Sequence, residues 1–175
     1  MNYLSVDKLT KYIGEKLLFD GLSFGLEKGD KKALVARNGA GKSTLLKILF
    51  GLDEANDGVV AWRKDLTISY QKQSEDLNNT QSVRESFYHL DFRAFQLLND
   101  YNNVLNNGET PSSELLEQLD NSKAWDKEVL MSVLLDKLDL TELIDAPVKS
   151  LSGGQLKRLS LAHALVVEPD VMILD

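Results

Sequence analysis

A chain of 175 residues is long enough for one domain with a proper core, and 43% hydrophobic with 27% charged residues is ordinary for a globular protein in water. The absence of cysteine excludes disulfides and thiolate metal sites, and no apolar run approaches the ~20 residues that cross a bilayer. The formal net charge is −7 and the N-terminal residues lack the apolar segment of a signal peptide, so we expect a cytoplasmic protein.

The first part of the chain carries the patterns of several strands and one helix. Short apolar patterns predict strands at residues 3–6, 17–26, 33–36, 59–62 and 66–70. The run at 33–36 is compact and wholly apolar, so we expect it to be buried. Leucine and isoleucine at helical spacing over 45–49 predict a helix, which Gly51 should end.

The middle of the chain changes to a helical period at Ser82. Apolar stripes at helical spacing, which we interpret as packing faces, cover residues 83–105, 115–119 and 125–140. Residues 74–146 hold 15 acids and 5 bases, whereas residues 1–73 hold 9 acids and 12 bases. An acidic lobe would repel phosphate backbones, so we expect no DNA partner, although solvated helix faces alone would explain the same acids.

The last part of the chain returns to the strand and helix pattern of the first. A helix is expected from Ser152 to just before Pro169, and the apolar run at 171–174 predicts another buried strand. Strands and helices thus alternate outside the middle stretch, which predicts an α/β fold with a helical insert. The expected division is an α/β core made of residues 1–73 and 150–175, with an acidic helical subdomain at 74–149.

A glycine-rich loop stands between a predicted strand and a predicted helix. Its residues are Arg37, Asn38, Gly39, Ala40, Gly41, Lys42, Ser43 and Thr44. Phosphates need many inward-pointing amides, and such a loop at a helix N-terminus supplies them. Lys42 would then reach the β- and γ-phosphates of a nucleotide, and the Ser43 hydroxyl would bind Mg²⁺. A helix cap with an incidental lysine is the simpler alternative.

One position of this loop departs from the full phosphate-loop pattern. The pattern has glycine five residues before Gly41, where this chain has Ala36. If the backbone there must be left-handed, alanine would cost about 1 kcal/mol. If φ is negative, the methyl group matters only by crowding, so the effect of Ala36 on ATP affinity stays open at this point.

A second motif is much less likely to occur by chance than the glycine-rich loop. It consists of Leu151, Ser152, Gly153, Gly154 and Gln155. Ser152 would cap a helix whose free amides, approached closely across two glycines, form a second anion site. With both motifs in order, the chain resembles the ATP-binding cassette (ABC) ATPases over its whole length, and this resemblance implies a P-loop NTPase core.

The resemblance assigns a role to each matching residue. Residues 41–44 match the Walker A motif, which binds ATP in the same domain, and residues 151–155 match the signature, which covers the ATP of a partner cassette. Asp175 ends a Walker B strand and would hold Mg²⁺ through water. Gln73 is similar to the Q-loop glutamine that senses the γ-phosphate and metal, with Gln71 as the competitor. Tyr12 falls where the family has an adenine-stacking aromatic residue.

The resemblance also implies parts that these 175 residues do not include. In the family a glutamate that polarises the attacking water follows the Walker B aspartate, and a switch histidine comes later. We therefore expect a core that is incomplete at its C-terminal side and a chain that binds ATP without hydrolysing it. Neither histidine of the chain fits the switch position, so we predict that His163 is a surface residue and that His89 packs on an apolar stripe.

Two kinds of ABC protein fit the sequence, and a DNA-repair type ATPase remains a third alternative. The long helical excursion before the signature, and the passage around Trp125, look like the first cassette of ABC-F proteins, a family that includes ribosome-associated translation factors. The other kind is the motor subunit of a membrane transporter. The implied partner is a second cassette, in the same chain or in a homodimer, with the ribosome contacted through parts outside these residues, or a membrane subunit in the transporter alternative.

Overall fold

The computed structural model describes residues 1–71 and 82–175, and the chain groups into two compact units. The sheet unit consists of Met1–Lys72 with Pro169–Asp175, and the helical unit consists of Gln73–Glu168. The sequence predicts that all of residues 150–175 belong to the α/β core, but the structure divides this segment between the two units. Its strand belongs to the sheet unit, whereas the helix before the strand belongs to the helical unit. The physical reason is that the apolar face of this helix is buried in the core of the helical unit.

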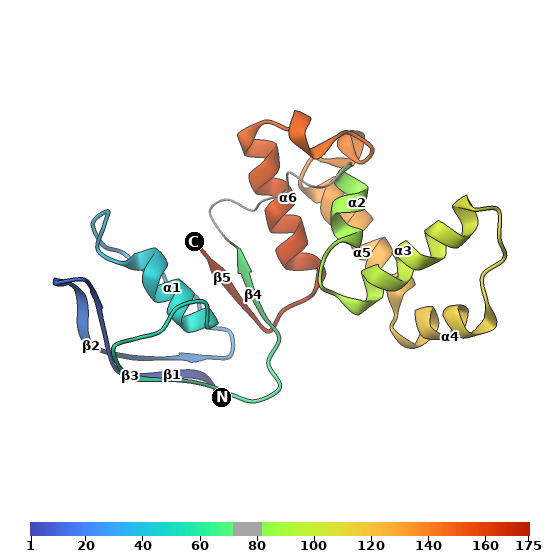
Figure 1. The fold of residues 1–175 in the computed structure, drawn as a ribbon. Coiled ribbons are helices and arrows are strands. Elements are labelled where there is room, and N and C mark those ends of the chain that lie inside the picture. The colour runs from blue at the N-terminus through green and yellow to red at the C-terminus, as the bar shows by residue number, and fades with distance from the viewer. Residues whose placement is uncertain (72–81) are drawn as a thin grey trace. The chain divides into compact units, whose positions relative to one another are not determined.

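The sheet unit contains two separate sheets (Figure 1). Strands β1 (Asn2–Ile13), β2 (Lys16–Glu27) and β3 (Asp57–Trp62) are antiparallel in the order β2-β1-β3. Strands β4 (Ile68–Gln71) and β5 (Val171–Leu174) form a parallel pair. The strands predicted at these places are confirmed, and the parallel pair brings the last residues of the chain beside residue 71.

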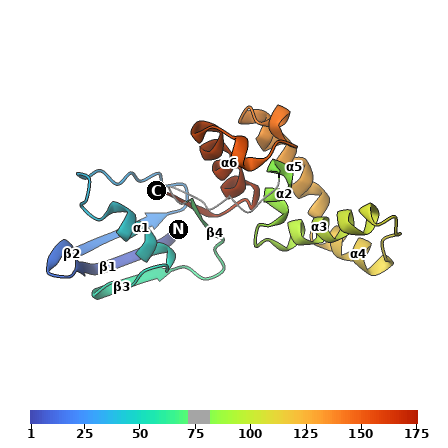
Figure 2. The same cartoon turned by 45° about the horizontal axis from the view of Figure 1, so that its top comes forward.

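Helix α1 (Lys42–Phe50) packs on one face of the three-stranded sheet (Figure 2). It ends at Gly51, which adopts the left-handed conformation with φ of 83°, as the sequence predicts. One apolar cluster joins α1 to both sheets, through Leu4, Val6, Leu9, Leu45, Ile48, Leu49, Tyr70 and Ile173. The same cluster therefore fixes the N-terminal turn of α1 relative to the end of β5.

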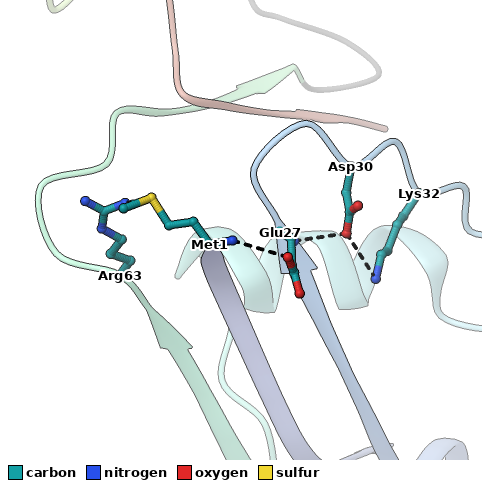
Figure 3. A network of polar contacts seen from close by, with 5 residues as sticks. All are labelled: Met1, Glu27, Asp30, Lys32 and Arg63. Carbon is teal, nitrogen blue, oxygen red and sulfur yellow. Dashed lines mark hydrogen bonds and ion pairs between the residues drawn. The ribbon is translucent and has the colours of Figure 1, made fainter.

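A chain of polar contacts ties the start of β1 to the turn after β2 (Figure 3). The terminal ammonium of Met1 lies 3.2 Å from a carboxylate oxygen of Glu27, and the Glu27 amide donates to Asp30 at 2.9 Å. Lys32 lies 3.5 Å from Asp30, while Arg63 contacts the sulfur of Met1. These groups are largely exposed, and exposed ion pairs contribute only about 0–1 kcal/mol, so the apolar cluster is the main support of the sheet unit.

The apolar run at residues 33–36 is not a strand, which corrects the prediction for this segment. It has no regular secondary structure, and Val35 is 94% exposed. None of the described strands pairs with it. A strand needs a neighbouring strand to satisfy its amides and carbonyls, so apolar composition alone does not form one.

In its described residues, 82–168, the helical unit contains five α-helices packed around one apolar core. Figure 1 shows these helices. In chain order they are α2 (Val83–Tyr88), α3 (Arg93–Asn106), α4 (Ser113–Asn121), α5 (Ala124–Lys137) and α6 (Gly153–Val166). Two short 3-10 helices, η2 (Thr141–Leu143) and η3 (Val148–Ser150), connect α5 to α6. Serine side chains cap α2, α4 and α6, and the predicted helical stripes supply most of the core.

The two histidines exchange the roles that the sequence predicts. His163 is buried, with its Nε2 2.8 Å from the hydroxyl of Ser86 and its ring edge-on to Phe87 at 4.4 Å. His89 is exposed and bonds through Nδ1 to the carbonyl of Glu85. The predictions fail because α6 turns His163 toward α2, whereas His89 follows the last residue of α2 and lies outside the packed face.

Replacing His163 with alanine should lower the free energy of unfolding of the helical unit by about 2–3 kcal/mol. The change leaves a cavity beside Phe87 and removes a partner of the buried Ser86 hydroxyl. Urea unfolding followed by circular dichroism at the helical band measures the loss. The matched control is His89→Ala, which should change stability by less than about 0.5 kcal/mol; equal effects of the two changes would contradict the buried role of His163.

Within residues 1–71 and 82–175, no helix combines the length and the apolar character that spanning a membrane demands.

Candidate functional site

The loop ahead of α1 is shaped by its glycines. Gly39 and Gly41 adopt left-handed conformations with φ of 78° and 90°, which residues with a Cβ enter only at a cost. A Cβ on Gly41 would also lie 3.1 Å from the side chain of Leu18. The amide of Ala40 donates to the carbonyl of Arg37 at 3.2 Å and closes a tight turn. The backbone path into the helix therefore depends on glycine at both positions.

Helix α1 begins with backbone amides that no side chain caps, as far as the described residues go. Its N-cap is Gly41, and its first turn contains no acidic residue. Thr44 is half-buried in this turn, while Asn38 is exposed in the preceding loop. Uncapped amides at a helix N-terminus, together with the helix dipole, attract anions. The predicted loop residues thus surround a helix end that suits a phosphate group.

Lys42 folds back over the loop that precedes it. Its Nζ donates to the carbonyl of Ala36 at 2.8 Å and to the carbonyl of Arg37 at 3.1 Å. These neutral acceptors are weaker than phosphate oxygens, which carry charge, so a bound phosphate can replace them. Ala36 is not among the described residues with positive φ, so alanine in place of the pattern's glycine brings no left-handed strain.

Oxygen atoms from α1, β4 and the end of β5 meet beside this helix end. The Ser43 hydroxyl donates to Oδ1 of Asp175 at 2.7 Å, and the Tyr70 hydroxyl donates to Oδ2 of the same carboxylate at 3.0 Å. Burial, followed by the hydrogen bond to Asp175 and its negative charge, raises the pKa of Tyr70 to about 12. Tyr70 is therefore a neutral hydrogen-bond donor throughout the physiological pH range.

The donor set fits Mg²⁺ bound together with a nucleotide. Ser43 and Asp175 offer a hydroxyl and a carboxylate within one hydrogen bond of each other. Mg²⁺ prefers hard oxygen ligands and commonly uses one or two protein groups, with phosphate oxygens and water completing its shell. The loop amides and Lys42 can hold the phosphates that this arrangement requires.

The second predicted motif forms the N-terminus of α6 in the helical unit. Ser152 is the N-cap and makes a capping box with Gln155: the Gln155 side chain accepts from the Ser152 amide at 2.7 Å, and the Gln155 amide donates to the Ser152 hydroxyl at 3.4 Å. A Cβ on Gly153 or Gly154 would meet nothing within 4 Å. The predicted cap is confirmed, and the exposed glycines leave the helix end open to close approach.

Two further predicted residues stand apart from these groups. Tyr12 is 43% exposed near the end of β1, and its amide donates to the side chain of Asn56 at 2.8 Å. Gln73 lies outside the described residues. Its competitor Gln71 ends β4, where its carbonyl accepts from the amide of Asp175 at 3.2 Å. The adenine-stacking role of Tyr12 and the Q-loop role of Gln73 stay predictions.

Sequence reasoning missed Tyr70 as a member of this group. The signal available was a tyrosine inside a predicted buried strand, since a buried hydroxyl needs a hydrogen-bond partner. The partner is Asp175, which lies 105 residues further along the chain. The parallel pairing of β4 with β5 had to be known before that partner could be named.

Comparison with known proteins places these features in a family. The family model described as "ABC transporter" matches residues 19–175. The ABC transporter ATP-binding protein YfmR of Bacillus subtilis, itself described as uncharacterized, is 33% identical over all of this chain. The energy-dependent translational throttle protein EttA of Mycobacterium tuberculosis is 30% identical over 98% of it. The chain spans 29% and 32% of the lengths of these two relatives.

The fold is similar to that of solved cassettes. A nucleotide-free ATP-binding cassette from an ABC transporter superposes with a TM-score of 0.68 at 27% identity, over 100% of this chain and 69% of that one. The α/β P-loop fold predicted from the sequence is thereby confirmed.

Proposed function

This chain belongs to the ABC transporter ATPase family, and we propose that it binds ATP and Mg²⁺ at residues 37–44 and Asp175. The observation that carries the proposal is the 2.7 Å contact between Ser43 and Asp175, made beside the uncapped N-terminus of α1. A hydroxyl, a carboxylate, a lysine and free amides are the groups that phosphate and its metal require. In the parent protein, hydrolysis of this ATP would drive the closing and opening of paired cassettes, in the cytoplasm where ATP is supplied.

Each residue has a distinct part in this proposal. The loop amides and Lys42 hold the phosphates and neutralise their charge, while Ser43 and Asp175 hold the metal, which screens the phosphate oxygens when bound. Tyr12 would stack on the adenine and Gln73 would sense the γ-phosphate and metal. Residues 152–155 would cover the nucleotide of a second cassette, in the same chain or in a homodimer. The open N-terminus of α6 supports this last role.

For the parent protein we propose an ABC-F type ATPase with a role in translation. Similarity to the translational throttle protein EttA supports it. So does the helical unit, where α3 and α4 precede α5 and Trp125 at the start of α5 lies edge-on to Tyr101 at 5.1 Å. The ribosome would be contacted by parts outside these residues.

The alternative is the motor subunit of a membrane transporter, which similarity to a transporter cassette favours. The sequence that follows Asp175 in the parent distinguishes the two. A glutamate, a charged helical linker, and then a second phosphate loop and signature would support ABC-F. A single cassette that ends soon after a switch histidine would support the transporter motor and a membrane subunit as partner.

The 175-residue chain by itself should hydrolyse ATP no faster than a buffer control. In the family a glutamate positions the attacking water, and phosphoryl transfer depends on such positioning. Release of inorganic phosphate, measured with and without the chain, tests this. Turnover that disappears in Lys42→Ala would contradict the prediction, because it would show that these residues suffice for hydrolysis.

A further inference from the structure

Tyr70 reaches Asp175 because of the register between β4 and β5. Tyr70 lies opposite Ile173 in the parallel pair. Side chains two residues apart on a strand point to the same face, so Tyr70, Ile173 and Asp175 share one face of the pair. The amide of Asp175 extends the ladder by donating to the carbonyl of Gln71 at 3.2 Å. The contact between the tyrosine hydroxyl and the carboxylate is therefore set by the backbone.

The ring of Tyr70 has a contact of its own, with Phe50. It stacks on Phe50 with a centroid distance of 5.2 Å and an interplanar angle of 30°, and only 9% of the residue is exposed. Phe50 is the last residue of α1, and Ser43 is the second. Tyr70 and Asp175 thus contact the two ends of the helix that carries the phosphate loop.

The carboxylate of Asp175 is held at both oxygens. Ser43 bonds Oδ1 at 2.7 Å, and Tyr70 bonds Oδ2 at 3.0 Å. When a metal takes up the Ser43 oxygen, the Tyr70 hydroxyl remains to orient the carboxylate. Hydrogen bonds of this kind to a metal-binding group keep it in position and raise metal affinity.

We propose that Tyr70 is a positioning residue for the divalent cation: its hydroxyl aims Asp175 toward Ser43 and so strengthens cation binding in the nucleotide complex. The inference rests on the proposed function, because it concerns the metal that accompanies ATP at this loop. Tyr70 would thus belong to the site through Asp175, without contacting phosphate or metal itself.

The test is Tyr70→Phe, which keeps the ring stacked on Phe50 and removes only the hydroxyl. Two quantities are measured on the 175-residue chain: the affinity for a fluorescent ATP analogue in EDTA, and the Mn²⁺ concentration needed to form the ternary complex, followed by electron paramagnetic resonance. The variant should need about tenfold more Mn²⁺. Its nucleotide affinity in EDTA should equal that of the wild type, because the phosphate contacts are untouched.

Tyr3→Phe is the matched control. Tyr3 is also buried in the sheet unit, but its ring lies beneath the guanidinium of Arg63 instead of at the site. A second variant, Phe50→Leu, keeps the hydroxyl while loosening the ring, and should shift the Mn²⁺ requirement in the same direction by a smaller factor.

Three results would overturn the inference while leaving ATP binding intact. The first is an unchanged Mn²⁺ requirement in Tyr70→Phe. The second is a loss of affinity for the ATP analogue in Tyr70→Phe that is the same with Mn²⁺ and in EDTA. The third is a rise in the Mn²⁺ requirement of Tyr3→Phe as large as that of Tyr70→Phe. A wild-type chain that binds no nucleotide would instead overturn the proposed function, and this inference with it.

Discussion

Replacing Lys42 with alanine should weaken ATP binding by about 100-fold or more, which corresponds to roughly 3 kcal/mol. The Nζ of Lys42 is held at the mouth of the loop by the carbonyls of Ala36 and Arg37 at 2.8 and 3.1 Å. On binding it exchanges these neutral acceptors for charged phosphate oxygens, and charge-assisted hydrogen bonds are about twice as strong as neutral ones. Titration of a fluorescent ATP analogue with Mg²⁺ present measures the change.

Lys47→Ala is the control for the loss of a positive charge from α1. Lys47 lies in the last turn of the same helix, at the opposite end from the loop, and is exposed. The Lys47→Ala substitution should leave ATP affinity within about threefold of the wild type, since a single exposed charge at the far end of the helix is largely screened by salt. If Lys42→Ala and Lys47→Ala weakened binding alike, the phosphates would not bind at this loop.

Replacing Gly58 with alanine should lower the stability of the sheet unit by about 4 kcal/mol, or prevent it from folding. Gly58 has φ of 92°, and a Cβ there would lie 2.5 Å from the carbonyl oxygen of Lys8 and 2.6 Å from Cα of Leu9. These neighbours are backbone atoms of β1 in a bulge, where Lys8 and Leu9 face the single residue Gly58. Relief of the clash would separate β1 from β3.

Gly14→Ala is the matched control, because Gly14 also has a positive φ of 58° but a Cβ there meets nothing within 4 Å. It should cost only about 1–2 kcal/mol, the price of the left-handed conformation. Urea unfolding in a Trp125→Phe background measures both variants, since Trp62 on β3 then reports the sheet unit alone. Equal losses in the two variants would show that strain in φ, and not the close approach of β1, decides the effect.

Local patterns predicted the parts whose physics is local. Gly51 ends α1 because a left-handed residue closes a helix, and Ser152 caps α6 because the amide that its side chain accepts from lies within one turn. The glycine-rich loop could be recognised for the same reason, because a phosphate cradle is a property of eight consecutive residues. The departure at Ala36 could be noticed in the sequence, but its effect on the backbone could only be judged from φ.

Predictions that required a partner distant in the chain failed or could not be made. The apolar run around Val35 is exposed because no described strand pairs with it. His163 is buried because α2 supplies Ser86 and Phe87 as partners.

The sequence by itself determined the family, the glycine-rich loop ahead of α1, the serine cap of α6 and the alternation of strands and helices, because each is encoded in residues that are neighbours along the chain. Only the tertiary structure decided that α6 belongs with the helical unit. It also decided that Tyr70 and Ser43 share the carboxylate of Asp175. These outcomes depend on which surfaces bury one another and on strand register. Both are set by the free energy of the whole fold, and a local pattern does not contain them.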